Sequence, residues 1–202
     1  MPAGARDGRR DGRRDVRGVW RPLPPRSTST RTTVSCFLEG GSLHDIRVEE
    51  GLNWENAEAV CSWTNRQGAD FLEQWAGPEL TFPLTVEALQ GLSNPYSIFL
   101  SGEFVGLIQK IRVEQGTAHI GRFLIDPEHT GKGIGKHALM EFINMICMDS
   151  SISSISLAVL AHNIRARSLY EKLGFATYEV AGHPQGKLLM KRMRTSFFRD
   201  MS

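Results

Sequence analysis

Several features are scarce in this chain of 202 residues. Its three cysteines, Cys36, Cys61 and Cys147, are widely spaced and form no C-x-x-C pair. Because a structural zinc site needs closely patterned ligands, we expect reduced thiols and no bound metal. No apolar run approaches the length of a membrane span, and the first residues lack a hydrophobic signal core. We therefore expect a cytoplasmic protein with no membrane partner.

Charge is distributed unevenly along the chain. Residues 1–31 hold nine Arg and three Asp, a net charge of +6, whereas the rest holds fifteen basic and nineteen acidic residues, a net charge of −4. The repeated RDGR segments offer no apolar face, so residues 1–44 are predicted to be a disordered, basic, low-complexity tail. Aspartates interrupt the arginines and no aromatics alternate with them, so no nucleic-acid partner is expected.

The segment from His119 to Met145 is predicted to form a strand, a glycine-rich loop and a helix. The β-favouring run 123–125 ends at Asp126-Pro127, because proline cannot donate to a sheet ladder. Apolar residues then recur at helical spacing. The glycines between these elements would lie at the helix N-terminus, where free N–H groups and a partial positive charge can bind a phosphate or pyrophosphate. These glycines are Gly131, Gly133 and Gly135.

Two common nucleotide motifs do not fit this loop. A Walker A loop would need glycine where Thr130 stands, and Ser or Thr where His137 follows Lys136. The dinucleotide fingerprint should begin directly after its strand, whereas seven residues intervene here. The next apolar strand, 155–160, also ends without the carboxylate that binds a ribose.

Short helices and then strands are predicted upstream of the loop. A first strand near residue 46 precedes a helix that is capped by Asn53, with Trp54, Ala57, Val60 and Cys61 directed towards the core. Two further short helices are expected at residues 70–75 and 85–90. Strands at 96–100 and 103–113 form a hairpin and continue into the strand that ends at residue 125, giving an antiparallel meander. The strand at 155–160 should pair with that last strand in parallel, through a right-handed crossover.

A second motif follows that parallel strand. Asn163 is a good N-cap, apolar residues from 166 to 173 share one helix face, and Gly174 sits where a left-handed residue ends a helix. The segment reads N-x-x-A-x-x-L-Y-x-x-x-G-F without a break.

These two motifs, in this order, resemble those of the GNAT superfamily of N-acetyltransferases. The loop DPEHTGKGIG is similar to the family's acetyl-CoA loop, R/Q-x-x-G-x-G/A after a strand ending in Asp-Pro, with Thr130 in place of Arg or Gln. The resemblance implies an α/β fold of the α+β type: a central mixed, mostly antiparallel sheet of six to seven strands with helices on both faces. It covers residues 45–194, and 195–202 would be a short tail.

The resemblance also implies an activity and a set of site residues. Acetyl-CoA would be the co-substrate, and a primary amine on a small molecule or a protein would attack it directly in a ternary complex. The alternative is a degenerate acyl-CoA-binding or regulatory module without turnover. A homodimer remains open. The implied coenzyme-binding residues are Phe123, Leu124, Ile125, Thr130, Gly131, Lys132, Gly133, Ile134, Gly135, Lys136 and Asn163.

Catalytic and acceptor residues are less completely specified. Tyr170 is implied to stand by the sulfur, where its hydroxyl could act as general acid on the departing thiolate. Some relatives have a glutamate base at the position of Ala158, so His119 and ordered water are equal candidates for the base here. Trp75 and Phe82 are candidates for lining the acceptor site.

Overall fold

The computed structural model describes residues 45–181 and 186–194. All described elements belong to one unit, residues 42–202. The two predicted tails, 1–44 and 195–202, lie outside the described residues. Elements therefore begin with β1 (Ile46–Glu50) and end with β7 (Lys187–Met193).

The first half of the unit contains α1 (Trp54–Gln67), α2 (Ala69–Ala76) and α3 (Val86–Gln90), followed by β2 (Pro95–Leu100) and β3 (Glu103–Glu114). The second half contains β4 (Thr117–Ile125), a 3-10 turn (Pro127–His129), α4 (Ile134–Cys147), β5 (Ser154–Leu160), α5 (Ile164–Lys172) and β6 (Ala176–Ala181).

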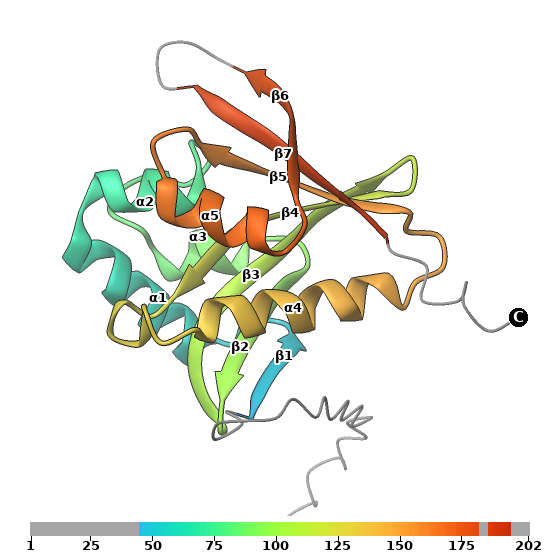
Figure 1. The fold of residues 1–202 in the computed structure, drawn as a ribbon. Coiled ribbons are helices and arrows are strands. Elements are labelled where there is room, and N and C mark those ends of the chain that lie inside the picture. Colours follow the sequence, from blue (N-terminus) through green and yellow to red (C-terminus); the bar gives the residue numbers. More distant parts are fainter. Residues whose placement is uncertain (1–44, 182–185, 195–202) are drawn as a thin grey trace, which may run out of the picture. The chain divides into compact units, whose positions relative to one another are not determined.

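The described strands form one seven-stranded sheet in the order β1-β2-β3-β4-β5-β7-β6 (Figure 1). Neighbours pair antiparallel except β4 and β5, which pair in parallel. The predicted meander and the predicted parallel pair are both confirmed.

Two apolar clusters cover opposite faces of this sheet. Ile108 joins the cluster beneath α4 and α5, whereas its neighbour Leu107 joins the cluster beneath α1, α2 and α3. Successive strand residues point to opposite faces, so the alternation of β3 accounts for both layers. Figure 1 shows α4 running across one face of the sheet.

The entry to α1 follows the prediction in part. Asn53 caps the helix by accepting a hydrogen bond from the N–H of Asn56 at 2.7 Å. Ala57, Val60 and Cys61 are buried as expected, but Trp54 is 53% exposed. Its indole donates to Glu58 at 2.9 Å. The indole N–H of Trp54 therefore has its hydrogen-bond acceptor on the solvent side of the first helical turn. The prediction that Trp54 lies in the core was wrong.

β4 and β5 pair only over their first residues, from Thr117↔Ser154 to His119↔Ser156. Between Gly121 and Leu124, β4 contains one more residue than the facing segment of β3, and Arg122 adopts the left-handed conformation with φ +47°. An extra residue of this kind bends a strand and ends its regular pairing. The bulge therefore accompanies the divergence of β4 from β5.

Gly106 allows β3 to follow the bulged strand closely. A Cβ atom at this position would lie 2.4 Å from the carbonyl oxygen of Leu124. That contact is with backbone and leaves no room for a side chain, so glycine is required where β3 passes the bulge.

Candidate active site

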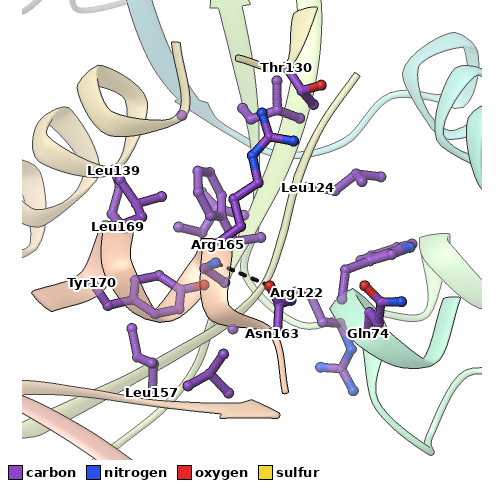
Figure 2. A pocket seen from close by; sticks show the side chains of 18 of the residues that line it. Gln74, Arg122, Leu124, Thr130, Leu139, Leu157, Asn163, Arg165, Leu169 and Tyr170 are labelled. Atoms are coloured by element: carbon purple, nitrogen blue, oxygen red, sulfur yellow. Dashed lines mark hydrogen bonds between the residues drawn. The ribbon is translucent and has the colours of Figure 1, made fainter. Parts of the chain in front are cut away.

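A cavity of about 620 Å³ opens where β4 and β5 diverge. Residues 120–125 of β4 form one wall and residues 157–159 of β5 form the other. The loop before α4 and the start of α5 line one end, while α1 and α2 line the other (Figure 2). Because β4 and β5 diverge, the glycine-rich loop and the motif that begins at Asn163 line the same cavity.

The glycine-rich loop presents main-chain donors at the first end. Gly131 and Gly133 both have φ +83°, a left-handed conformation that residues with side chains rarely adopt. α4 begins directly afterwards, and no side chain caps its N-terminus. Among the described residues, no acceptor is recorded for the N–H groups of residues 131–135. This end is therefore suited to an anion such as a pyrophosphate.

Arg165 adds a cation from α5 to the Lys136 side chain that the loop region already contributes to the lining. The Thr130 hydroxyl donates to the carbonyl of Pro127 at 2.9 Å, so it is turned back into the 3-10 turn. The Arg165 side chain, in contrast, extends from α5 towards Thr130 (Figure 2). Its Nη2 atom would lie 3.4 Å from a Cβ placed on Gly131. Within the described part of the chain, its guanidinium has no ion-pair partner.

Asn163 and Tyr170 line the cavity from α5 and its N-terminal cap. Asn163 caps α5 by accepting a hydrogen bond from the N–H of Ala166 at 3.1 Å, which fixes the start of that helix. Tyr170 packs edge-on against Phe175 and turns its hydroxyl towards the cavity (Figure 2). Burial raises the pKa of Tyr170 from 10.0 to about 12, so the hydroxyl is protonated at neutral pH.

The second end of the cavity is built from distant parts of the sequence. Arg122 is 8% exposed and lies on the face covered by α2. Its Nη1 donates to Gln109 at 2.5 Å, and its Nη2 pairs with the Glu79 carboxylate. The side chains contributed by α1 and α2 are two amides and two aromatic rings. They are Gln67, Phe71, Gln74 and Trp75.

No carboxylate and no histidine is found among the described residues that line the cavity. Ala158 occupies the β5 position where a glutamate base was considered. His119 lies at the paired end of β4 and β5, where it shares a 2.5 Å hydrogen bond with Ser156. Burial and the nearby Arg112 lower the pKa of His119. His119 is not among the described residues that line the cavity.

Most of the other predicted site residues line the cavity, but three do not. Phe82 is 46% exposed and outside the lining, whereas Trp75 lies within it. Ile134 packs into the core at 2% exposure, because the first turn of α4 directs it inwards. Lys132 is exposed and absent from the lining. The predicted residues that the cavity brings together are Trp75, Phe123, Leu124, Ile125, Thr130, Gly131, Gly133, Gly135, Lys136, Asn163 and Tyr170.

The sequence leaves the register of β4 open and so does not tell whether Arg122 enters the cleft, and no pattern in it singled out Arg165. An arginine amid the apolar residues of β4 was the available signal for Arg122. Arg165 follows the capping Asn163 by two positions, and its direction depends on how α5 packs.

Comparison with known proteins decides the family. Residues 49–175, more than half of the chain, match the model of the Acetyltransferase (GNAT) family. The chain belongs to the GNAT family of acetyltransferases. The recognition made from the two motifs is thus confirmed, and the chain is an acetyl-CoA-dependent N-acetyltransferase.

Individual relatives agree with this assignment. The chain is 26% identical to aminoglycoside N(6')-acetyltransferase type 1 of Klebsiella pneumoniae over 164 residues, covering 71% of this chain and 81% of the relative. It is 28% identical to spermine/spermidine N(1)-acetyltransferase of Bacillus subtilis (strain 168) over 89 residues, covering 41% of this chain and 59% of that one.

Solved structures support the GNAT fold. The structure of AAC(6')-Ib in complex with ribostamycin and coenzyme A superposes with a TM-score of 0.61 at 23% identity. The match covers 78% of this chain and 98% of that one. The predicted sheet, mixed and mostly antiparallel with helices on both faces, is confirmed. In the described ranges no helix is long and apolar enough to cross a membrane.

Proposed function

We propose that this GNAT enzyme transfers an acetyl group from bound acetyl-CoA to a primary amine by direct attack in a ternary complex. The observation that carries this proposal is the continuity of the cavity, which joins an anion-binding loop, the free edge of β4 and the Tyr170 hydroxyl. Relatives named for aminoglycosides and polyamines acetylate amines, which supports an amine acceptor here.

In this proposal the coenzyme lies along the cavity, with its pyrophosphate at the glycine-rich loop and its pantetheine arm beside β4. The pyrophosphate contacts the main chain of the loop from Gly131 to Lys136, with Arg165 on its other side. The pantetheine arm runs along residues 123–125, whose edge towards β5 is left free once the strands diverge. Main-chain N–H and C=O groups there can pair with the arm's amides as a further strand would.

The chemistry requires a neutral amine, whose nitrogen attacks the thioester carbon. A C–N bond forms, the C–S bond breaks, the amine proton leaves to water, and the departing sulfur takes a proton from water to end as a thiol. Tyr170 donates a hydrogen bond to that sulfur as negative charge develops on it. Its pKa of about 12 lies well above the roughly 8.5 of an ordinary thiol, so this hydrogen bond is favoured over complete proton transfer.

Direct attack agrees with the cysteines of the described residues. Cys61 lies on the buried face of α1, where burial raises its pKa to about 11. Cys147 is the last residue of α4. Neither lines the cavity. A thiol that lies away from the thioester is a poor nucleophile for it, so no acetyl-cysteine intermediate is expected at either of these two residues.

Steady-state kinetics test this function. With acetyl-CoA and an amine both varied, and free thiol measured, a ternary complex gives intersecting double-reciprocal lines. Parallel lines would indicate a covalent acetyl-enzyme and overturn direct attack. Binding is tested separately by thermal unfolding, because acetyl-CoA that binds only the folded state raises Tm with the logarithm of its concentration. The absence of any shift at millimolar acetyl-CoA would contradict the assigned coenzyme site.

A further inference from the structure

The cavity wall formed by α2 is linked to the sheet by one ion pair. Glu79, which lies three residues beyond the end of α2, pairs with Nη2 of Arg122 on β4. Among the described residues, no other hydrogen bond or ion pair joins residues 69–83 to the sheet. α2 itself contributes three side chains to the cavity lining, Phe71, Gln74 and Trp75.

The Arg122 side of this pair is fixed by the fold. Its side chain is 7% exposed, whereas that of Glu79 is 76% exposed. Nη1 of Arg122 donates to the Gln109 amide on β3, which donates in turn to the carbonyl of Ser93 at 2.6 Å. The left-handed backbone of Arg122 also belongs to the β4 bulge. The guanidinium therefore takes its direction from β3 and the bulge, and Glu79 on its exposed loop is the partner that is held in place.

Stability alone does not account for an arginine at this position. Nε of Arg122 is buried without a hydrogen-bond partner in the described part of the chain, which costs free energy. Buried ionic groups can often be replaced by apolar residues of similar size with no loss of stability. α2 and β4 already pack through apolar residues such as Leu72 and Leu124. Apolar contacts have no preferred direction, so what the ion pair adds is a fixed position for its partner.

The pair stands at the end of the cavity that the proposed coenzyme leaves free. In the proposed function the coenzyme extends from the glycine-rich loop along residues 123–125, so the amine acceptor is left with the end that α1 and α2 line. Arg122 directly precedes that strand edge, and Figure 2 shows it at the same end as Gln74 of α2. The separation between α2 and the β4 bulge therefore sets the width of the acceptor end.

We propose that Glu79 and Arg122 are positioning residues for the amine acceptor. Their pair holds α2 at the distance from the β4 bulge at which its side chains contact the bound acceptor. Gln109 acts one step further back, by fixing the direction of the guanidinium. This inference rests on the proposed acetyl transfer and adds residues that affect binding of the amine and not of the coenzyme.

Steady-state kinetics of the full chain at saturating acetyl-CoA test this role. Ribostamycin, spermidine and alaninamide are screened as amine probes by release of free thiol, and the probe with the highest kcat/KM is used throughout. Glu79→Ala removes only the exposed partner of the pair. We expect it to raise KM for the probe by about three- to fivefold, the effect of a partly exposed ion pair. The kcat and the Kd for acetyl-CoA should stay unchanged, because the α2 wall holds the acceptor equally before and during the reaction.

Arg122→Lys separates position from charge. It keeps the cation, but an ammonium group lacks the rigid fork with which the guanidinium donates to Gln109 and Glu79 together. We expect the same rise in KM as in Glu79→Ala, and no further rise in the double variant, since both changes remove one link. Glu79→Ala carries the test by itself should Arg122→Lys fail to fold.

Glu73→Ala is the matched control. Glu73 is an exposed carboxylate on α2 that lies outside the cavity lining and has no ion-pair partner among the described residues. Its replacement removes the same charge from the same wall, so KM for the probe should stay unchanged.

The outcomes separate this inference from the function beneath it. An unchanged KM for the probe in Glu79→Ala would overturn the positioning role and leave the acetyltransferase intact. Equal rises in KM for the probe and in Kd for acetyl-CoA would show a general effect on the fold and would also overturn it. If none of the three probes is acetylated although acetyl-CoA binds, the proposed transfer to an amine fails first, and the positioning role fails with it.

Discussion

The two ends of the same cavity, proposed as the coenzyme end and the acceptor end, are built by different means. At the coenzyme end, one continuous segment from Phe123 to Lys136 supplies a strand edge, two left-handed glycines and a helix N-terminus. At the acceptor end, α1, α2 and the β4 bulge each contribute one or a few side chains. The first end offers mainly backbone groups, and the second mainly side chains.

This difference explains why the sequence predicts one end of the cavity better than the other. Backbone recognition depends on local conformation, which glycine and proline spacing largely dictates. Side-chain recognition depends on which residues the tertiary fold brings together, and Arg122, Gln109 and Glu79 meet across separate elements. The coenzyme end should therefore be sensitive to backbone changes, while the acceptor end should respond to single side-chain changes.

Gly133→Val should have the largest effect. A branched side chain at φ +83° strains the loop and intrudes where the pyrophosphate is placed. We expect the Kd for acetyl-CoA, measured by titration calorimetry, to rise by about 100-fold. Gly102→Val is the control, because Gly102 has φ +91° in the β2–β3 turn with open space around it. Similar losses of binding in both variants would mean that general strain, and not the site, is responsible.

Tyr170→Phe should lower kcat by about 10- to 100-fold, the value of one hydrogen bond to a developing charge. KM for acetyl-CoA should change little, because the hydroxyl acts late in the reaction. Tyr178→Phe serves as the control, since Tyr178 is 50% exposed on β6 beneath the Lys191 ammonium group. An unchanged kcat in Tyr170→Phe would remove the hydroxyl from the mechanism.

Arg165→Gln should raise the Kd for acetyl-CoA by about tenfold, since a charge-assisted bond to phosphate is worth about 1.5–3 kcal/mol before water competes. Adding Thr130→Arg should restore much of the loss by placing a cation on the loop itself. Lys172→Gln removes an exposed cation from the far end of α5 and should leave binding unchanged. If Lys172→Gln weakens binding as much as Arg165→Gln does, only overall charge matters. If the Thr130→Arg rescue fails, a cation at position 130 does not reach the phosphates.

His119→Gln should have the smallest effect and should act on stability only. The pKa of His119 is lowered below 6.5 in the folded protein, so the unfolded chain binds the proton first as the pH falls. The free energy of unfolding should therefore decrease from pH 6.5 down through the folded pKa, and less steeply in the variant. Urea titrations across that range measure the slope. A large fall in kcat at neutral pH would instead return His119 to the list of candidate bases.

The sequence predicted the elements whose signals are local. The caps at Asn53 and Asn163, the hairpin at Ser101-Gly102 and the strand end at Asp126-Pro127 all occur where expected. Trp54 was misplaced, because helical spacing alone does not say which side of the first turn faces solvent. The place of His119 outside the cavity lining could not be predicted for a similar reason. The strand pattern does not reveal where β4 leaves β5.

By itself, the sequence determined the family, the glycine-rich loop and the parallel strand pair around it. These follow from hydrogen-bonding and dihedral preferences of residues close together in the chain. Only the tertiary structure decided that Arg165 covers the loop, that Arg122 lies buried at the acceptor end, and that no carboxylate lines the described cavity wall. Those facts depend on the β4 bulge and on the packing of helices from opposite faces of the sheet, which arise from contacts between residues far apart in sequence.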